Sequence, residues 1–463
     1  MGSIVRLASL TISNIKNVRN GQIIMSNAYR KQFSANRAEV LGIYGQNGSG
    51  KTAVIDTLYY LQRIMTGSPL DEQVSEYIDS NSEQAEIHAD FHIFMEDVIY
   101  EAGYKIQIRK NAKRAEIVRE VLSCSINKDA SRTNKTVFMD YQRAEKEQIF
   151  TPKKRLDEIT EVSKENKIEL LVARKIAEKD NCSYIFGESS REIFCKEYKN
   201  NFQHYSNVIR ALFLFALKDL FVIRNTHSGV ISANFLLPMA FKIEKDEIRA
   251  KGDFAVSLTE PVVLSEERKQ ILDIIVAQIN MVLYTIIPGM KIDIYHYGEQ
   301  LTDDGEKGFR VELVSVRENM PPIPIRMESE GIIKIISILN AWIQAFGNPS
   351  ICLAIDELDA GVFEYMLGEL LDIFPKSAKG QLVFTSHNLR PLEMLDKDSI
   401  MFSTANPDRR YIHMKNIKAS NNLRDVYIRG ITLGGQDEVI YEETDSLKIA
   451  RAFRKAGRAA KYE

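Results

Sequence analysis

Strand-like and helix-like patterns of apolar residues alternate along the first 125 residues of the chain. Residues 4–13 and 39–44 are rich in Ile, Val and Leu, which favours β-strands. Residues 53–65 carry apolar side chains at helical spacing, and residues 85–125 alternate between apolar and polar positions. The pattern therefore predicts a strand–loop–helix unit followed by a sheet built from hairpins.

The pattern changes over residues 126–290, which carry many charges and are predicted to be mostly helical. The clearest helix spans 265–287, because Ser265 is a suitable N-cap and Pro288 ends the run. The most apolar stretch, 209–223, is too short to cross a bilayer. We expect this stretch to form a buried helix.

Strands are predicted again at 290–297 and 309–316, and a helix is predicted over 331–346. Residues 350–355 and 381–385 are short and largely apolar, which is typical of parallel strands buried on both faces, and a helix near 363–374 separates them.

The sequence thus predicts an α/β protein in four segments. The two halves of the core are expected at 1–125 and 291–400, a mostly helical insertion at 126–290, and a basic extension at 401–463. The alternating stretch at 85–125 would form a β-rich subdomain beside a mixed core sheet.

Composition and charge exclude several classes of protein. The 463 residues are 44% hydrophobic and 27% charged, which is typical of a soluble globular protein with two or three domains. A net charge of −2 excludes a polycation, so any contact with nucleic acid must come from local patches. Residues 1–30 lack a signal-peptide pattern, and we expect a cytoplasmic protein without a membrane partner. The cysteines, Cys124, Cys182, Cys195 and Cys352, lie far apart and are expected to be reduced structural thiols.

Residues 45–52 read Gly-Gln-Asn-Gly-Ser-Gly-Lys-Thr, the pattern of a phosphate-binding loop. Glycines let backbone N–H groups approach the phosphates of ATP, and the following helix directs its positive end at them. The lysine would reach the β- and γ-phosphates, and the threonine hydroxyl would bind Mg²⁺. A plain glycine turn is the alternative, but the flanking strand and helix favour the nucleotide loop. The candidate ATP-binding residues are Gly45, Asn47, Gly48, Ser49, Gly50, Lys51 and Thr52.

A second motif follows the apolar run 351–355, which ends in Asp356 and Glu357. This is typical of a Walker B strand, in which the first carboxylate holds Mg²⁺ and the second polarises the attacking water. The alternative is a strand that ends in an exposed acidic turn. With a phosphate loop upstream we expect Asp356 to be a metal ligand and Glu357 to be catalytic.

Two further segments can present polar groups to an anion. Ser329 and Gly331 precede the helix predicted over 331–346, where a hydroxyl, backbone N–H groups and the helix dipole would meet a phosphate, although a plain N-cap has the same residues. His387 follows the buried strand 381–385, and a lone histidine at such a place is often structural.

These motifs, in this order, resemble the ABC-type ATPase heads of the SMC and RecF class. They are still more similar to bacterial AAA-type ATPases of the overcoming-lysogenisation-defect kind. The resemblance covers about 1–125 and 290–400, and Asn14–Val18 resembles the element that opens such heads. The runs at 356–359 and 386–387 look like those of ATPase subunits in the PARIS and AbiL-type phage-defence systems.

The resemblance implies a dimer of heads with two ATP molecules between the subunits. Lys51, Thr52, Asp356, Glu357 and a catalytic His387 that senses the γ-phosphate would then act in one subunit, while Ser329 and Gly331 act from the other. Residues 358–361 would form the D-loop at the dimer contact. Residues 433–436, Leu-Gly-Gly-Gln, are closer in composition to the usual signature motif, but they follow the Walker B strand and are interpreted as a turn.

The chain also departs from the pattern of these families. Glu330 replaces the first glycine of the signature motif, and Gln84 and Gln107 are weak candidates for a Q-loop glutamine. The chain after His387 is too short for the Toprim nuclease of a complete overcoming-lysogenisation-defect protein. A nuclease, Toprim-like or RloB-like, would therefore be a separate chain.

Basic residues gather near the end of the chain and once in the middle. Each group is either a solvated face or a contact surface for nucleic acid or an acidic partner. The groups are Arg409, Arg410, Lys415, Lys418, Arg424 and Arg429; Arg451, Arg454, Lys455, Arg458 and Lys461; and Arg109, Lys110, Lys113 and Arg114.

The leading hypothesis is an ATP-binding and ATP-hydrolysing sensor subunit of a bacterial anti-phage system that controls a separate effector. A RecF-like DNA-repair ATPase is the second hypothesis. A transporter ATPase is less suitable, because the insertion at 126–290 and the opening element at 14–18 do not fit it.

Overall fold

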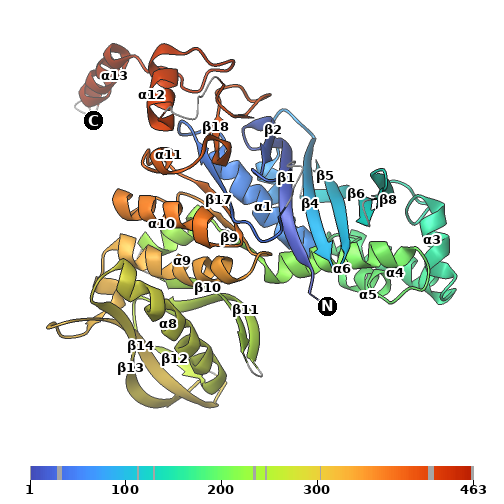
Figure 1. Ribbon diagram of the computed structural model, residues 1–463, viewed down its shortest axis with the longest axis horizontal. Helices are drawn as coiled ribbons and strands as arrows, with labels where there is room; N and C mark the ends of the chain where they lie inside the picture. The colour runs from blue at the N-terminus through green and yellow to red at the C-terminus, as the bar shows by residue number, and fades with distance from the viewer. Residues whose placement is uncertain are drawn as a thin grey trace.

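A computed structural model describes residues 2–28, 34–111, 114–128, 131–232, 236–245, 248–302, 304–415 and 422–459. Figure 1 shows a central α/β layer, a large antiparallel sheet on one side of it and a smaller lobe of strands and one long helix on the other. The C-terminal helix lies away from all three parts.

The central layer is a six-stranded sheet with the order β19-β18-β3-β17-β16-β9. All neighbouring strands from β18 to β9 run parallel, and only β19 is antiparallel to its neighbour. The predicted strands at 39–44, 350–355 and 381–385 are confirmed as three adjacent members of this sheet. The strands are β19 (Tyr411–Ile412), β18 (Ile400–Ser403), β3 (Glu39–Tyr44), β17 (Gln381–Thr385), β16 (Cys352–Ile355) and β9 (Leu220–Ile223).

Helices cover both faces of the central sheet, so its strands are buried on both sides. On one face, Leu41 and Ile43 belong to the core that contains α1 (Lys51–Met65). On the other, Leu353 and Ile355 belong to the core formed with α9 (Glu330–Gly347) and α10 (Glu364–Ser377). The helices predicted over 53–65, 331–346 and 363–374 are all confirmed.

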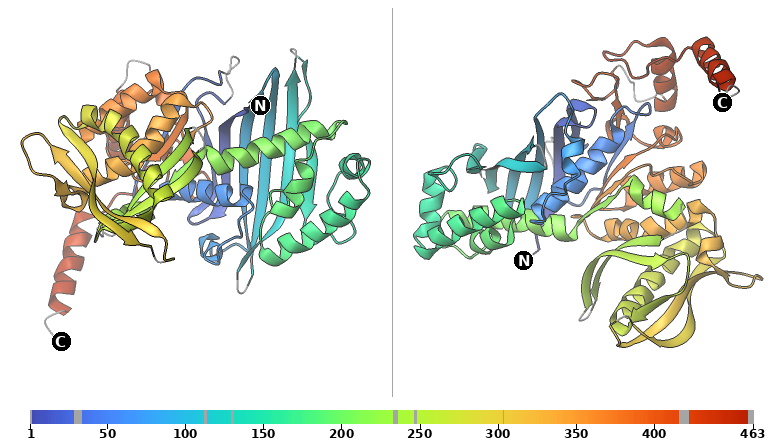
Figure 2. Two further views of the ribbon diagram at one scale, coloured as in Figure 1. Left: turned by 90° about the horizontal axis from the view of Figure 1, so that it is seen from below. Right: turned by 180° about the vertical axis from the view of Figure 1, so that it is seen from behind.

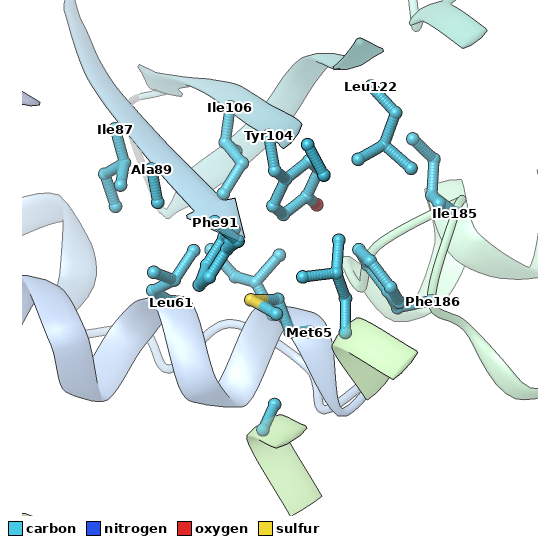
Figure 3. Close-up of a cluster of buried hydrophobic side chains, with 14 of the residues drawn as sticks. Leu61, Met65, Ile87, Ala89, Phe91, Tyr104, Ile106, Leu122, Ile185 and Phe186 are labelled. Atoms are coloured by element: carbon cyan, nitrogen blue, oxygen red, sulfur yellow. The ribbon is translucent and has the colours of Figure 1, made fainter. Parts of the chain in front are cut away.

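The second sheet is antiparallel, with the order β2-β1-β4-β5-β6 and two short strands, β7 and β8, on β6. Figure 3 shows how α1 packs against it: Leu61 and Met65 meet Phe91 of β4, with Tyr104 of β5 and Phe186 close by. The predicted hairpin-rich sheet over 85–125 is therefore confirmed. Its strands are β1 (Ile4–Ile15), β2 (Val18–Ile24), β4 (Gln84–Met95), β5 (Val98–Lys110), β6 (Ala115–Lys128), β7 (Ser131–Arg132) and β8 (Thr136–Gln142).

Four helices follow the antiparallel sheet, and the last of them, α6 (Phe202–Lys218), crosses it and packs on α1 (Figure 2). The predicted buried helix over 209–223 needs a correction, because the helix ends at Lys218 and residues 220–223 form β9 in the central sheet. A four-residue apolar run has no period that separates helix from strand, so pairing with β16 decides its structure. The other helices are α3 (Lys153–Thr160), α4 (Glu165–Asp180) and α5 (Glu188–Phe194), and α2 (Val74–Tyr77) precedes the sheet's long hairpins.

The smaller lobe also changes the prediction of a mostly helical segment over 126–290. Strands occupy much of 220–265, because β10 pairs with β11 and β12 pairs with β14. The predicted helix at 265–287 is confirmed as α8 (Glu266–Ile286), and the Ser265 hydroxyl accepts a hydrogen bond from the Arg268 N–H. The other elements are α7 (Asn225–Ser232), β10 (Leu236–Lys245), β11 (Ile248–Ser257), β12 (Val262–Ser265), β13 (Met290–Leu301), β14 (Lys307–Arg317) and β15 (Ile323–Pro324).

Among the described helices, α8 is the one with the length and composition of a membrane span. Its residues Leu272, Ile275 and Ile279 are buried in the core of the smaller lobe. The chain ends with α11 (Pro391–Met394), α12 (Leu423–Leu433) and α13 (Ser446–Ala459). Leu433, the first residue of the predicted turn at 433–436, is the last residue of α12, and Gly434 and Gly435 follow it in a loop at positive φ.

Candidate nucleotide-binding site

The loop 45–52 joins the end of β3 to the start of α1, at the edge where the parallel strands have their carboxyl ends. Gly45, Gly48 and Gly50 all have positive φ, of 152°, 77° and 89°. This conformation favours glycine, since it turns successive backbone N–H groups toward one hollow. The loop therefore has the backbone shape that its sequence predicts.

The Lys51 side chain lies folded over this loop. Its Nζ donates to the carbonyl oxygens of Gly45 at 2.9 Å and Gln46 at 3.0 Å. Burial lowers the pKa of Lys51, while the carboxylates of Asp356, Glu357 and Asp359 act in the opposite direction. The ammonium group thus donates to the carbonyl oxygens of its own loop, and a phosphate bound in the hollow would attract it more strongly.

The outer side of the loop is held by residues from β18 and β19. The Ser49 hydroxyl lies 2.5 Å from that of Ser403, and the Tyr411 hydroxyl donates to the Gly50 carbonyl at 2.6 Å. A Cβ atom on Gly45 would lie 2.0 Å from Ser403 Oγ. Gly45 and Ser49 therefore shape the loop from behind.

Arg410 belongs to this support and not to a basic surface patch. It is 5% exposed, and its guanidinium donates to the carbonyl oxygens of Thr404 and Asn17. Asn17 in turn donates to the Gly48 carbonyl. Neither alternative given for the group over 409–429, a solvated face or a contact surface, fits Arg410, because its hydrogen bonds tie the N-terminal strands to the phosphate loop.

Asp356 follows β16 and is 1% exposed. Its Oδ1 accepts hydrogen bonds from Thr385 Oγ1 at 2.6 Å and Thr52 Oγ1 at 3.3 Å, while its buried Oδ2 has no hydrogen-bond partner among the described residues. Burial raises the pKa of Asp356, and the two hydroxyl groups lower it. A buried carboxylate oxygen without a partner, beside a threonine hydroxyl, is a donor set that suits Mg²⁺.

Glu357 has a left-handed backbone, with φ of 48°. Its N–H donates to Thr385 Oγ1 at 2.7 Å, and its carbonyl accepts from Lys334 Nζ. Lys334 lies on α9 and is 4% exposed; burial lowers its pKa, and the carboxylates of Asp359, Glu357 and Asp356 raise it. Sequence reasoning missed Lys334, because a lysine one turn into an apolar helix gives no local sign of its contact.

His387 lies at the open edge of the same site. The backbone N–H of His387 donates to Asp359 Oδ2 at 3.1 Å, and the backbone N–H of Asn388 donates to the same oxygen at 2.9 Å. Desolvation and the nearby Lys51 ammonium lower the pKa of His387, which favours the neutral imidazole, while the carboxylates of Asp359, Glu357 and Asp356 act in the opposite direction. Asp359 thus holds the loop that presents the histidine.

A cavity of about 450 Å³ lies at the phosphate loop, Glu357 and His387, and its volume is suitable for a small-molecule ligand. It brings together most of the residues predicted for one subunit. The predicted residues Gly45, Ser49 and Asp356 are not part of its lining. The sequence analysis did not predict Lys16, Asn17 and Thr385 as site residues, although residues 14–18 resemble the element that opens ABC-type ATPase heads. The lining residues are Lys16, Asn17, Asn47, Gly48, Gly50, Lys51, Thr52, Ala53, Glu357, Thr385 and His387.

Ser329 and Gly331 lie outside this cavity. Ser329 is the exposed N-cap of α9, and its hydroxyl makes no capping hydrogen bond. Gly331 is packed so closely against the predicted D-loop that a Cβ atom there would lie 1.8 Å from the Gly361 carbonyl oxygen. Within one chain the structure therefore packs Gly331 against Gly361 of the predicted D-loop, and neither Ser329 nor Gly331 lines the cavity at the phosphate loop.

The two weak Q-loop candidates do not reach the cavity either. Gln84 and Gln107 lie in β4 and β5, and Gln107 is hydrogen-bonded to Glu86. Arg224, directly after β9, is at the carboxyl edge of the central sheet and lies 3.6 Å from Asp56 of α1.

The predicted basic groups differ in how far their charge is neutralised. Arg409 and Lys415 pair with Asp437, and Arg424 pairs with Glu393, so the group over 409–429 is largely balanced by acids. Arg114 lies 3.5 Å from Glu116 in the middle group. Lys113, Lys418 and Lys461 lie outside the described residues.

The helix α13 is different, because it is exposed along its length (Figures 1 and 2). Its basic residues share the surface with apolar side chains, of which Leu447 is 69% exposed and Phe453 76% exposed. A solvated helix face does not need these large apolar groups.

No family model matches the chain, and no curated protein matches it. Among solved structures, the chain is similar to an Smc head bound to the C-winged helix domain of ScpA, with a TM-score of 0.41, 14% identity and coverage of 88% of this chain and 96% of that one. It is also similar to the Smc head domain with a coiled coil and joint from Pyrococcus yayanosii, with a TM-score of 0.41, 12% identity and coverage of 92% and 100%. The SMC head domain from Thermotoga maritima has a TM-score of 0.35, 13% identity and coverage of 89% and 99%.

Proposed function

We propose that this chain is an ATPase subunit that binds ATP with Mg²⁺ and works as a nucleotide-dependent switch. One observation carries the proposal: Thr52 and Glu357 meet Lys51 at a single cavity, and Asp356 Oδ1 lies 3.3 Å from Thr52 Oγ1, although more than 300 residues separate Thr52 from Asp356. An acidic turn in an ordinary protein has no reason to meet a phosphate-binding loop in this way.

Each side chain has a role that follows from its place. Lys51 would exchange the carbonyl oxygens of its own loop for the β- and γ-phosphates, and the N–H groups of 47–52 would hold the remaining phosphate oxygens. Thr52 and Asp356 Oδ2 would hold Mg²⁺, which supplies positive charge to the phosphate oxygens when bound. Glu357 would orient the attacking water, and the neutral imidazole of His387 would accept or donate a hydrogen bond beside the γ-phosphate.

The switch proposal adds a second copy of the chain. Ser329 exposes a hydroxyl group without a capping role at the N-terminus of an 18-residue helix, a place that suits an anion, yet its own chain's cavity does not include it. The phosphate bound there would therefore belong to a second subunit. Lys334 on the same helix donates to the Glu357 carbonyl. A movement of α9 when Ser329 binds the partner's nucleotide would therefore also move Glu357 of the same chain.

The ATPase proposal is tested by comparing two variants with opposite expected effects. Lys51→Ala should abolish ATP binding in calorimetry, whereas Glu357→Gln should keep ATP binding, slow hydrolysis about 100-fold and prolong the ATP-bound dimer. Lys376→Ala, on the exposed surface of α10, serves as the matched control for Lys51→Ala. Wild-type ATP binding by Lys51→Ala would refute the proposal.

We propose further that the subunit controls a separate effector, as the resemblance to phage-defence ATPases suggests. The exposed α13 offers a surface for that partner. The Glu442 N–H before this helix donates to Gln46 of the phosphate loop at 3.0 Å, which gives the helix a connection to the nucleotide.

The effector proposal predicts that a neighbouring gene product, with the properties of a Toprim-like or RloB-like nuclease, co-purifies with the tagged chain from its native host. Protection from phage should require both proteins and should be lost with Lys51→Ala. A chain that purifies alone and protects without any second protein would rule the effector out.

A RecF-like DNA-binding ATPase is the second candidate, and the cationic face of α13 favours it. In that case duplex ends or gapped DNA should stimulate hydrolysis without any partner, and the stimulation should fall steeply as salt is raised. The exposed apolar residues of α13 favour a protein partner over DNA.

A further inference from the structure

A segment without regular secondary structure joins α12 to α13, and we call its residues 436–442 the strap. Figure 1 shows α12, α13 and β18 at the same end of the molecule. The strap lies between them, and its last residue, Glu442, reaches Gln46 of the phosphate loop, 396 residues earlier in the sequence. It therefore connects the exposed C-terminal helix to the candidate nucleotide site.

The middle of the strap is fixed against residues 404–415, which include β19. The Val439 carbonyl accepts a hydrogen bond from the Ala405 N–H at 2.7 Å. Ile440 is 3% exposed and belongs to the core that contains α9 and α10. A Cβ atom on Gly430 would lie 2.8 Å from Ile440 Cδ1, so the side chain is closely packed. A buried side chain and paired backbone groups make the strap a fixed part of the fold.

The end of the strap pairs with the side chain of Gln46, the second residue of the phosphate loop. The Glu442 N–H donates to Gln46 Oε1 at 3.0 Å, and Gln46 Nε2 donates to the Glu442 carbonyl at 3.4 Å. Both groups on the strap belong to the backbone, so the pair depends on where the chain lies at Glu442 and not on its carboxylate. The Gln46 side chain is not part of the lining of the nucleotide cavity.

The backbone of Gln46 holds the charged group of the candidate site. Its carbonyl accepts hydrogen bonds from Lys51 Nζ at 3.0 Å, from Ser49 Oγ at 2.6 Å and from the Ser49 N–H at 3.2 Å. On the proposed mechanism, Lys51 leaves this carbonyl for the β- and γ-phosphates when ATP binds. The Gln46 peptide then loses one of its three donors and is held less firmly, which weakens the pair that its side chain makes with the strap.

The other end of the strap is joined closely to α13. Residues 443–445 complete the connection, and Asp445 Oδ1 accepts the N–H groups of Leu447 at 2.9 Å and Lys448 at 3.1 Å. This is the hydrogen-bond pattern of an N-cap, which ties the first turn of a helix to the residue before it. A shift of α13 is therefore passed to Glu442 across three residues.

We propose that the strap couples α13 to the phosphate loop: ATP binding loosens the Gln46–Glu442 pair, and a partner on α13 that holds the pair together lowers the affinity for ATP. This coupling rests on the proposed ATPase function and adds the route by which the nucleotide and the partner influence each other. Linkage makes the effect reciprocal, since whatever ATP does to the pair, the pair does to ATP affinity. Such couplings change affinity by about 5- to 150-fold, and an exposed pair belongs near the lower end.

Hydrogen exchange of the full chain, with and without saturating ATPγS and Mg²⁺, measures the pair directly. In the wild type, the Glu442 amide should exchange about fivefold faster when ATPγS is bound. Gln46→Met removes both hydrogen bonds of the pair, so the same amide should exchange fast and at one rate in both conditions. Glu442→Ala is the matched control, because it keeps both backbone groups and should respond like the wild type.

Calorimetry measures the reciprocal effect from the side of the strap. Glu442→Pro removes the N–H that donates to Gln46 and leaves every residue of the phosphate loop unchanged. It should bind ATPγS about fivefold more tightly than the wild type, whereas Glu442→Ala should keep the wild-type Kd. Gln46→Met should shift the Kd in the same direction as Glu442→Pro, which keeps the test valid if the proline disturbs the strap.

Two outcomes would overturn the coupling alone. In the first, ATPγS binds but the exchange of the Glu442 amide stays the same or slows. In the second, Gln46→Met and Glu442→Pro both bind ATPγS with the wild-type Kd. A wild-type chain that binds no ATPγS would instead refute the ATPase proposal and the coupling together, so calorimetry on the wild type separates the two failures.

Discussion

Lys334→Met removes the ammonium group that holds the peptide of Glu357. Lys334 Nζ donates to the Glu357 carbonyl, and the Glu357 N–H donates to Thr385 Oγ1 at 2.7 Å. The left-handed backbone at Glu357, with φ of 48°, costs a non-glycine residue about 1–2 kcal/mol. The two hydrogen bonds offset this cost. Methionine is an unbranched side chain of similar length, so it would fill the same buried volume without the hydrogen bond.

The expected loss follows from these magnitudes. A hydrogen bond to a charged group is worth about 1.5–3 kcal/mol, which is at least as large as the cost of the left-handed backbone. Without it we expect Glu357 to leave its place in most molecules. Since 1.36 kcal/mol corresponds to tenfold in rate, kcat for ATP hydrolysis should fall roughly 10- to 100-fold. ATP binding should be nearly unchanged, because Lys334 does not line the nucleotide cavity.

The same variant should also alter the pH dependence of hydrolysis. Burial already raises the pKa of Asp356, and loss of a nearby cation raises it further. On the proposed mechanism Asp356 must be ionised to hold Mg²⁺, so we expect activity to be lost as the pH falls through its pKa. The acidic limb of the pH–rate profile should therefore move to higher pH in Lys334→Met.

The assays are steady-state hydrolysis across pH and calorimetric ATP binding, with Lys376→Met as the control on the exposed surface of α10. A merely structural lysine would lower the melting temperature and the active fraction but would leave the pH profile in place. Hydrolysis within twofold of the wild type, with the same acidic limb, would refute the role assigned to Lys334.

Three further predictions concern other parts of the chain. Gly45→Ala places a Cβ atom 2.0 Å from Ser403 Oγ at a backbone φ of 152°. We therefore expect the variant to lose about 1–3 kcal/mol of stability in urea unfolding and to bind ATP more weakly. Wild-type stability and wild-type ATP affinity would contradict the close packing. Arg6→Met breaks a fully buried ion pair with Glu39 and should cost about 3–5 kcal/mol in the same unfolding assay, and a loss below 1 kcal/mol would show that the pair does not matter. Phe453→Asp on α13 should abolish co-purification of a protein partner and leave the hydrolysis rate intact, whereas retained co-purification would place the partner elsewhere.

The phosphate loop and the strands beside it could be predicted from sequence because their signals are local. Three glycines within six residues permit the positive φ angles of the loop, and the apolar runs on either side need no distant partner to be recognised. The same holds for the capped helix α8, where Ser265 and the apolar period lie within one stretch of sequence. Lys51, Thr52, Asp356 and Glu357 were all identified in this way.

Contacts between distant segments were beyond such signals. Residues 220–223 are apolar in either a helix or a strand, and only pairing with β16 makes them an edge strand of the central sheet. Arg410 belongs to a basic run in sequence, yet its buried guanidinium supports Asn17 behind the loop. Lys334 gives no sign in sequence of its contact with Glu357, 23 residues away on another element.

The sequence by itself thus determined the chemical groups at the candidate nucleotide site, because glycine geometry, hydroxyl groups and carboxylates keep their chemistry wherever the chain places them. The tertiary structure alone decided which of them meet. It brought Lys16, Asn17 and Thr385 to the cavity, and it kept Ser329 outside it. The physical reason is that local pattern sets secondary structure, whereas burial of both faces of the central sheet sets the distances between segments far apart in the chain.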